Sequence, residues 1–263
     1  MNRNNPIGIF DSGIGGTSIW TAINNYLPNE NTIYLADSKN APYGEKSKQE
    51  IIDFSIKNTV FLMERNCKAI VVACNTATTN AISVLRTQFP QIPFIGIEPA
   101  IKPAAIKTLT KNIGILATRG TLSSDLFCKT SGSISKDIHI HVQNGEGLVS
   151  LIESGRLKSP ETLTLLKKYL SPMMAQNIDC LVLGCTHYPY LIPQIKLIVG
   201  EKVTLIDSGF AVAKQLERIL IAHNLLNNNA LIASHQFYCN ADIKVLKTIL
   251  KEVKDAKIDF FNF

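Results

Sequence analysis

Two cysteines stand where a thiol could act as a base. Cys74 and Cys185 each follow a short apolar run, and each precedes residues that can open a helix, Asn75-Thr76 and Thr186. A helix N-terminus offers free N–H groups and partial positive charge, which stabilise a thiolate. A free thiol has a pKa of about 8.5, so it needs only modest help to act as a base near neutrality. Two such thiols facing each other could remove a proton from one side of a carbon atom and return one on the other.

Each thiol has a nearby candidate for proton relay. His187 is two residues from Cys185, and Asp11, in an Asp-Ser-Gly turn, is the corresponding candidate for Cys74, although it could equally cap the following helix. A Cys/His metal site needs further ligands, and because no Cys-x-x-Cys pair or zinc spacing occurs, we expect no metal. The remaining cysteines are expected to be small buried core residues: Cys67, Cys128, Cys180 and Cys239.

A glycine-rich loop suggests an alternative from a different class, an NAD(P)-dependent oxidoreductase. Residues 13–18, Gly-Ile-Gly-Gly-Thr-Ser, follow an apolar run and open a helical stretch, and Asp37 ends the next run about 20 residues further on. Two features argue against a dinucleotide site. Ser18 occupies the third glycine position, where close helix packing requires Gly or Ala. Asp11 lies directly before the loop, where it would repel a pyrophosphate.

The elements that must position these residues alternate between short apolar runs and longer amphipathic stretches. The runs are nearly continuous in Val, Ile and Leu, as in parallel strands covered on both faces. Strands are expected over residues 7–10, 32–36, 69–73, 94–97, 112–117, 180–183, 203–206 and 235–239, and helices over 48–66, 161–176 and 211–226. This alternation predicts an α/β fold, whose ligands bind beyond the carboxyl ends of the strands.

The pattern also repeats along the chain. Ile-Gly-Ile-Phe at 7–10 returns as Ile-Gly-Ile-Leu at 113–116, and the Cys74 segment returns around Cys185 at similar spacing. We therefore expect two similar doubly wound α/β domains related by a pseudo-twofold repeat, with the active site in the cleft between them. Residues 1–98 plus 208–263 would form the first domain and residues 99–207 the second.

Composition limits the possible partners. The chain has 263 residues, of which 46% are hydrophobic and 18% charged, which suits a packed core and argues against disorder. The net charge of +6 is mild and the lysines are scattered, so nucleic acid is not an expected partner. We expect a soluble cytoplasmic protein without a membrane partner, because no secretory signal opens the chain and no apolar window approaches the roughly 18 residues of a membrane span.

Five separated segments together resemble the glutamate racemases. They are residues 10–16 (Phe-Asp-Ser-Gly-Ile-Gly-Gly), 42–44 (Pro-Tyr-Gly), 73–77 (Ala-Cys-Asn-Thr-Ala), 184–189 (Gly-Cys-Thr-His-Tyr-Pro) and 207–209 (Asp-Ser-Gly). The wider group includes aspartate and hydantoin racemases with the same paired cysteines, so aspartate as substrate stays open. The 42–44 turn and the His-Tyr-Pro ending favour the glutamate branch, and Ala77-Thr78-Thr79 is a departure of little expected effect.

The resemblance implies a cofactor-independent two-base racemase that supplies D-glutamate for peptidoglycan, and a homodimer. It implies that Cys74 removes the α-proton of D-glutamate with help from Asp11, and that Cys185 removes that of L-glutamate with help from His187. The substrate-binding residues that it implies are Ser12, Pro42, Tyr43, Gly44, Asn75, Thr76, Thr118, Thr121, Glu153 and Thr186, with Glu153 near the substrate amine. A two-lobed protein that binds an amino acid without chemistry is a third possibility.

Overall fold

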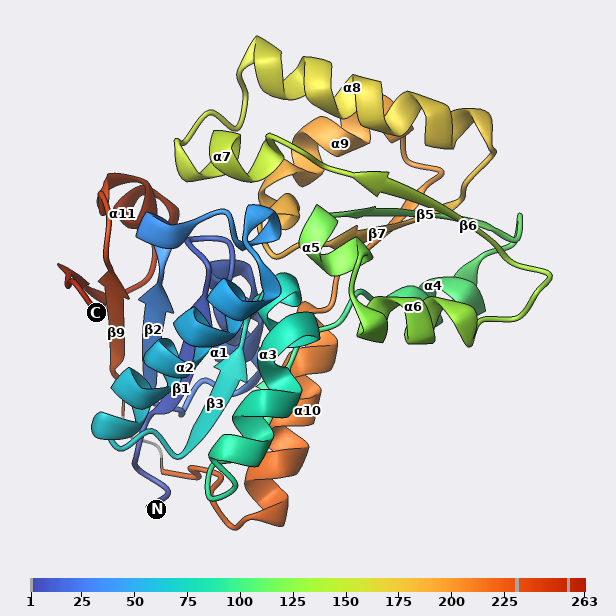
Figure 1. Cartoon of the computed structure of the whole chain (residues 1–263). Helices are drawn as coiled ribbons and strands as arrows, with labels where there is room; N and C mark the ends of the chain where they lie inside the picture. Colours follow the sequence, from blue (N-terminus) through green and yellow to red (C-terminus); the bar gives the residue numbers. More distant parts are fainter. Residues whose placement is uncertain (1, 230–231, 255) are drawn as a thin grey trace.

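The computed structural model describes residues 2–229, 232–254 and 256–263, which contain two parallel sheets (Figure 1). The first sheet has the strand order β10-β9-β2-β1-β3-β4 and the second the order β6-β5-β7-β8. The strands are β1 (Ile7–Asp11), β2 (Thr32–Ala36), β3 (Ala69–Val72), β4 (Phe94–Gly96), β5 (Asn112–Ala117), β6 (His139–Asn144), β7 (Cys180–Gly184), β8 (Thr204–Ile206), β9 (His235–Cys239) and β10 (Ala256–Phe260).

The two sheets repeat one topology. The order β2-β1-β3-β4 in the first sheet corresponds to β6-β5-β7-β8 in the second, strand for strand. The predicted pair of similar α/β halves is thereby confirmed. The first sheet adds β9, which pairs in parallel with β2 and brings the end of the chain back to the first half. The eight predicted strands are all present, with bounds that differ by at most one residue.

Two strands were not predicted, β6 and β10. Both lie at the edge of a sheet, and no residue of either is fully buried. An edge strand covered on one side lacks the continuous apolar run of a central parallel strand. His139–Asn144 and Ala256–Phe260 therefore carry a polar alternation that does not stand out in the sequence.

The helices include the three predicted long ones as α2, α8 and α10. Their bounds are α1 (Thr17–Tyr26), α2 (Lys48–Glu64), α3 (Asn75–Gln88), α4 (Ile101–Lys107), α5 (Arg119–Leu122), α6 (Asp125–Gly132), α7 (Leu148–Glu153), α8 (Pro160–Ala175), α9 (Ile192–Val199), α10 (Gly209–Ala222) and α11 (Lys244–Ile249), with short 3₁₀ turns η1 (Ser38–Asn40), η2 (Tyr43–Glu45) and η3 (Tyr188–Leu191). The helix predicted to 226 ends earlier because Asn224 turns left-handed at φ 55°. Across the described ranges, no helix is long and apolar enough to cross a bilayer.

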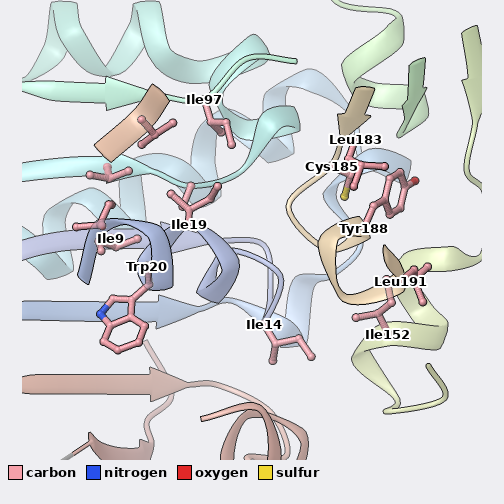
Figure 2. Packing of buried hydrophobic residues seen from close by; sticks show 14 of the residues in the cluster. Ile9, Ile14, Ile19, Trp20, Ile97, Ile152, Leu183, Cys185, Tyr188 and Leu191 are labelled. Atoms are coloured by element: carbon pink, nitrogen blue, oxygen red, sulfur yellow. The ribbon is translucent and has the colours of Figure 1, made fainter. Parts of the chain in front are cut away.

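A shared hydrophobic core joins the two halves. Figure 2 shows one cluster that runs from Ile9 and Trp20 of the first half to Leu183 and Tyr188 of the second. Ile14 lies between these groups in that view and belongs to the same cluster. In the first half, α1 and α10 pack against each other on this side of the sheet, whereas α2 and α3 pack on the opposite side. Because the halves share buried apolar surface, the polar strand ends between them are held close together.

Candidate active site

Cys74 caps a helix at the carboxyl end of the first sheet. It follows β3 and is the N-cap of α3, where its sulfur accepts a hydrogen bond from the Ala77 N–H at 3.4 Å. Its S–H donates to the Ser12 hydroxyl at 3.7 Å. The side chain is buried, and this burial, together with the neighbouring Asp11 carboxylate, raises the pKa of Cys74 well above the ordinary value. The surroundings therefore favour the protonated thiol at this position.

Asp11, the last residue of β1, is fully buried beside Cys74. Burial raises the pKa of Asp11 from 3.8 to about 6, against the opposing effects of His187 and of the hydrogen bond that Gly16 N–H donates to Oδ2 at 2.8 Å. Thr186 from the second half donates to Oδ1 at 3.4 Å. A carboxyl group with a pKa close to neutrality can both accept and return a proton, which suits a relay to a thiol.

On the other side of the cavity, His187 lies between Cys185 and the Glu153 carboxylate. The Cys185 sulfur lies 3.7 Å from His187 Nδ1, and His187 Nε2 lies 2.5 Å from Glu153 Oε1. Burial lowers the pKa of His187, but its hydrogen bonds to Cys185 and Glu153 outweigh this and hold the pKa well above its usual range. The imidazole lies within reach of the Cys185 sulfur and can exchange a proton with it.

A cavity of about 250 Å³ lies between the two thiols. It is lined by Ser12, Pro42, Tyr43, Gly44, Cys74, Asn75, Thr76, Thr118, Val149, Cys185, Thr186 and His187. Hydroxyls, an amide and the two thiols in this wall suit a small polar molecule. Because residues of both halves line it, closure of the cleft would surround the ligand.

Three residues predicted from the sequence, Asp11, Thr121 and Glu153, do not line the cavity but contact residues that do. Asp11 is bonded to Thr186 and Glu153 to His187, and Thr121 lies within 3.2 Å of the hydroxyl oxygens of Thr76 and Thr118. The structure thus brings all the named residues together, but Glu153 contacts the histidine and does not line the cavity. Val149 on α7 does line it and was not named, because an apolar residue on an amphipathic helix carries no sign of a site.

The cavity wall offers groups for a charged, polar ligand. Asn75, 4% exposed at the start of α3, has a side-chain oxygen without a hydrogen-bond partner among the described residues. The hydroxyl oxygens of Thr76 and Thr118 are 2.8 Å apart and belong to different halves. Buried acceptors need a donor, and helix N-termini and hydroxyls bind carboxylates. The wall therefore matches an ammonium group and carboxylates.

The glycine-rich loop is covered by protein and leaves no place for a dinucleotide. A Cβ atom on Gly13 would lie 2.0 Å from Glu153 Oε1, and one on Gly15 would lie 2.2 Å from His187 Nδ1. The glycines thus let the loop approach these two side chains. Asp37, the supposed ribose acid, is buried and accepts hydrogen bonds from Tyr43 and Asn240. The oxidoreductase alternative does not fit this arrangement.

The other cysteines are free thiols away from the cavity. Cys67, Cys180 and Cys239 are buried as predicted, whereas the prediction for Cys128 was wrong, because it lies on the exposed face of α6 next to the buried Phe127. Within the described part of the chain, no group of three or more His, Cys, Asp or Glu residues could hold a metal ion.

Two sheets of one topology, with a small polar cavity and one thiol from each half between them, define a class of two-lobed α/β proteins acting on a small molecule. Residues 7–216 match the sequence profile described as Asp/Glu/Hydantoin racemase. The chain belongs to this family and, within it, to the glutamate racemases.

The similarity to known glutamate racemases extends over nearly the whole chain. The enzyme of Ectopseudomonas mendocina is 43% identical over 251 residues, 95% of each chain. The Francisella tularensis structure in complex with D-glutamate gives a TM-score of 0.82 at 30% identity, covering 98% of this chain and 96% of that one. The Escherichia coli structure, in complex with L-glutamate and the activator UDP-MurNAc-ala, gives 0.83 at 30% identity and covers 97% of each.

Proposed function

We propose that this chain interconverts L-glutamate and D-glutamate, with Cys185 and Cys74 as the two bases. The observation that carries the proposal is the pair of buried thiols, one from each half, lining a single small cavity. The glutamate-bound structures of related racemases support glutamate as the ligand.

The reaction needs one thiolate and one thiol. From L-glutamate, the Cys185 thiolate takes the α-proton, so that an S–H bond forms and the C–H electron pair moves into a carbanion delocalised over the α-carboxylate. Cys74 then donates its S–H proton to the opposite face of the carbon atom, which gives D-glutamate. The reverse reaction exchanges these roles. His187 and Asp11 would hold or return the protons at their respective sulfurs.

The carbanion is the difficult species, and the chain's own groups would stabilise it. The cavity is buried, and its wall contributes the N-terminal N–H groups of α3 and several hydroxyls. Fixed dipoles in a site without bulk water act more strongly on developing charge than they would in solution. This is how racemisation would proceed with no added cofactor.

The substrate contacts follow from the donors and acceptors of the wall. Asn75 Oδ1, which has no hydrogen-bond partner in the part of the chain that the structure describes, would accept a hydrogen bond from the substrate ammonium group. Carboxylate contacts would come from the hydroxyls of Ser12, Thr76, Thr118 and Thr186, with Thr121 orienting two of them. Pro42, Tyr43 and Gly44 would close one side of the cavity.

Several wider properties are part of the same proposal. The domains would comprise residues 1–98 plus 208–263 and residues 99–207, in keeping with the two sheets. The protein would act as a cytoplasmic homodimer that supplies D-glutamate to peptidoglycan synthesis, the role of this family in the bacterial cell wall.

Circular dichroism of each glutamate enantiomer, without any added cofactor, tests the reaction. Cys74→Ser and Cys185→Ser should each lower kcat/KM by more than about 100-fold, because a hydroxyl is a far weaker acid than a thiol: it is not ionised near neutrality and donates its proton poorly. Cys128→Ser, an exposed thiol away from the cavity, is the matched control and should behave as wild type. Normal turnover in either cavity variant would refute the two-base assignment, and faster turnover of aspartate would make aspartate the substrate.

A further inference from the structure

The Glu153 carboxylate connects the two halves behind the cavity. Glu153 is the last residue of α7 in the second half. Among the described residues its side chain has three hydrogen-bond partners, and two of them belong to the first half. Its Oε1 accepts from the backbone N–H of Ile14 at 2.7 Å, and its Oε2 accepts from the hydroxyl of Ser38 at 2.8 Å. The third partner is His187 Nε2, 2.5 Å from Oε1. Both oxygens are therefore occupied, and the carboxylate has one defined orientation.

This orientation determines which nitrogen of His187 faces the thiol. A carboxylate behind Nε2 keeps that nitrogen protonated, because an unprotonated Nε2 would place a lone pair against Oε1. Nδ1 is then directed at the Cys185 sulfur, 3.7 Å away. Groups that orient a functional histidine in this way commonly determine how well it works. Glu153 thus acts on Cys185 through His187.

Ser38 is held rigidly on the first half. It begins the turn η1, directly after Asp37. The buried Asp37 carboxylate accepts hydrogen bonds from Tyr43 Oη and Asn240 Nδ2, both at 2.5 Å, and Asn240 Oδ1 accepts from the Lys39 N–H at 2.9 Å. These bonds tie the turn to β9 on one side and to the cavity wall at Tyr43 on the other. The Ser38 hydroxyl therefore has a fixed position relative to the site.

The contacts that position the Cys74 thiol differ from those that position Cys185. Its hydrogen-bond partners, the Ser12 hydroxyl and the Ala77 N–H, belong to its own half. The Cys185 side depends on a chain of contacts, from Ser38 through Glu153 to His187, that crosses from one half to the other. The contact between the halves on the Cys74 side, from Thr186 to Asp11, does not include Ser38 or Glu153. A change at Ser38 would therefore affect one of the two bases selectively.

We propose that Ser38 is a positioning residue for Cys185: its hydroxyl, with the Ile14 amide, orients Glu153 and thereby His187, so that Cys185 is fully active only when the two halves are in contact. The inference rests on the proposed racemase function and adds to it a difference between the two bases. It also assigns Glu153 to the histidine in place of the substrate amine.

The test is the primary deuterium isotope effect on kcat/KM, measured separately with α-deuterated L-glutamate and α-deuterated D-glutamate. The kcat/KM values of the two directions must fall together, because the equilibrium constant of racemisation is one, so they cannot distinguish the bases. In Ser38→Ala, loss of one hydrogen bond should lower both about three- to tenfold. The isotope effect should rise with deuterated L-glutamate, whose deuterium Cys185 removes, and fall with deuterated D-glutamate, whose deuterium Cys74 removes.

Two further variants complete the design. Glu153→Gln keeps the size of the side chain but removes its charge, and it should produce the same asymmetry with a larger loss. Ser154→Ala is the matched control, since its hydroxyl bonds to the carbonyl groups of its own helix and not to Glu153. Isotope effects in Ser38→Ala that equal those of wild type, or that change equally for both enantiomers, would overturn the inference. Failure of the wild-type enzyme to racemise glutamate would instead overturn the proposed function.

Discussion

At the scale of single residues, the two thiols occupy unlike surroundings. Cys74 lies beside the Asp11 carboxylate and is buried, and both conditions hold its proton in place. Cys185 lies beside His187, whose pKa is held well above its usual range by hydrogen bonds to Cys185 and Glu153. The two sides of the cavity therefore differ, with a carboxyl group beside one thiol and an imidazole beside the other.

Asp11 gives a prediction about stability and pH. Because burial raises its pKa from 3.8 to about 6, the folded chain binds this proton more tightly than the unfolded chain does. The free energy of unfolding should therefore fall as the pH rises from about 4 to about 6, and the pKa difference corresponds to about 3 kcal/mol. Asp11→Asn, which can still accept from Gly16 N–H, should lack this contribution.

Urea unfolding of both proteins at pH 4 and pH 7 measures the effect. From pH 4 to pH 7, the free energy of unfolding of wild type should fall by about 2–3 kcal/mol more than that of Asp11→Asn. This difference is the part of the pH dependence that Asp11 causes. An equal pH dependence in the two proteins would show that Asp11 titrates in the folded state as it does in the unfolded state.

At the scale of elements, the loop between β1 and α1 is a contact surface between the halves. Its glycines allow Glu153 and His187 to approach the backbone, so the same loop that suggested a dinucleotide site serves the thiol site. Gly13→Ala should displace the Glu153 carboxylate, because the new Cβ would lie 2.0 Å from Oε1. We expect a loss of kcat/KM of about tenfold or more, consistent with a misplaced supporting group.

The control for this substitution is Gly132→Ala at the end of α6, where an added Cβ meets no atom within 4 Å. That variant should keep full activity and gain slight stability from the better helix former. Racemisation rates measure the effect of each substitution on activity, and melting temperatures measure its effect on stability. A Gly13→Ala enzyme with wild-type activity would mean that Glu153 can move without consequence.

The sequence predicted the elements near the site better than those at the sheet edges. Central strands such as β5 and β7 are buried on both faces, so their apolar runs mark them. The edge strands β6 and β10 have no such run. The motif residues around Cys74 and Cys185 were also found from the sequence, because they directly follow the buried strands β3 and β7. Ser38 and Asn240 were not, because their role depends on contacts between segments far apart in the chain.

At the scale of the whole molecule, a buried ion pair connects four segments that lie far apart in the chain. Lys68, before β3, lies 2.5 Å from the Glu30 carboxylate, and their side chains are 0% and 1% exposed. Lys68 also donates to the carbonyl of Arg3, and Glu30 accepts from the Asn227 N–H at 2.9 Å. The N-terminal segment, the α1–β2 turn, the α2–β3 turn and the segment after α10 are thus tied together.

Lys68→Met should lower the free energy of unfolding by about 3–5 kcal/mol, because it leaves the Glu30 carboxylate buried without its partner. Lys196→Met is the matched control, since Lys196 and Glu201 form an exposed pair worth about 1 kcal/mol or less. Urea unfolding at pH 7 measures both. A loss below 1 kcal/mol for Lys68→Met would show that the Glu30 site relaxes or admits water.

The repeat in the sequence indicated two similar halves, and the matching strand orders confirm it. How the halves meet could not be read from the sequence, because the shared cluster is built from single apolar residues on elements such as α1 and η3 that look like ordinary core. The cavity depends on that packing, since its two thiols come from opposite sides of it.

The most direct test of the two-base account is racemisation in deuterium oxide without added cofactor, followed by proton NMR of the glutamate α-position. Starting from either enantiomer, the opposite enantiomer should form with deuterium at its α-carbon, because the base that returns the proton has exchanged with solvent. The starting enantiomer should gain deuterium more slowly than the product does. Product that keeps the original α-proton, or deuterium exchange without inversion, would contradict a mechanism with two separate thiol bases.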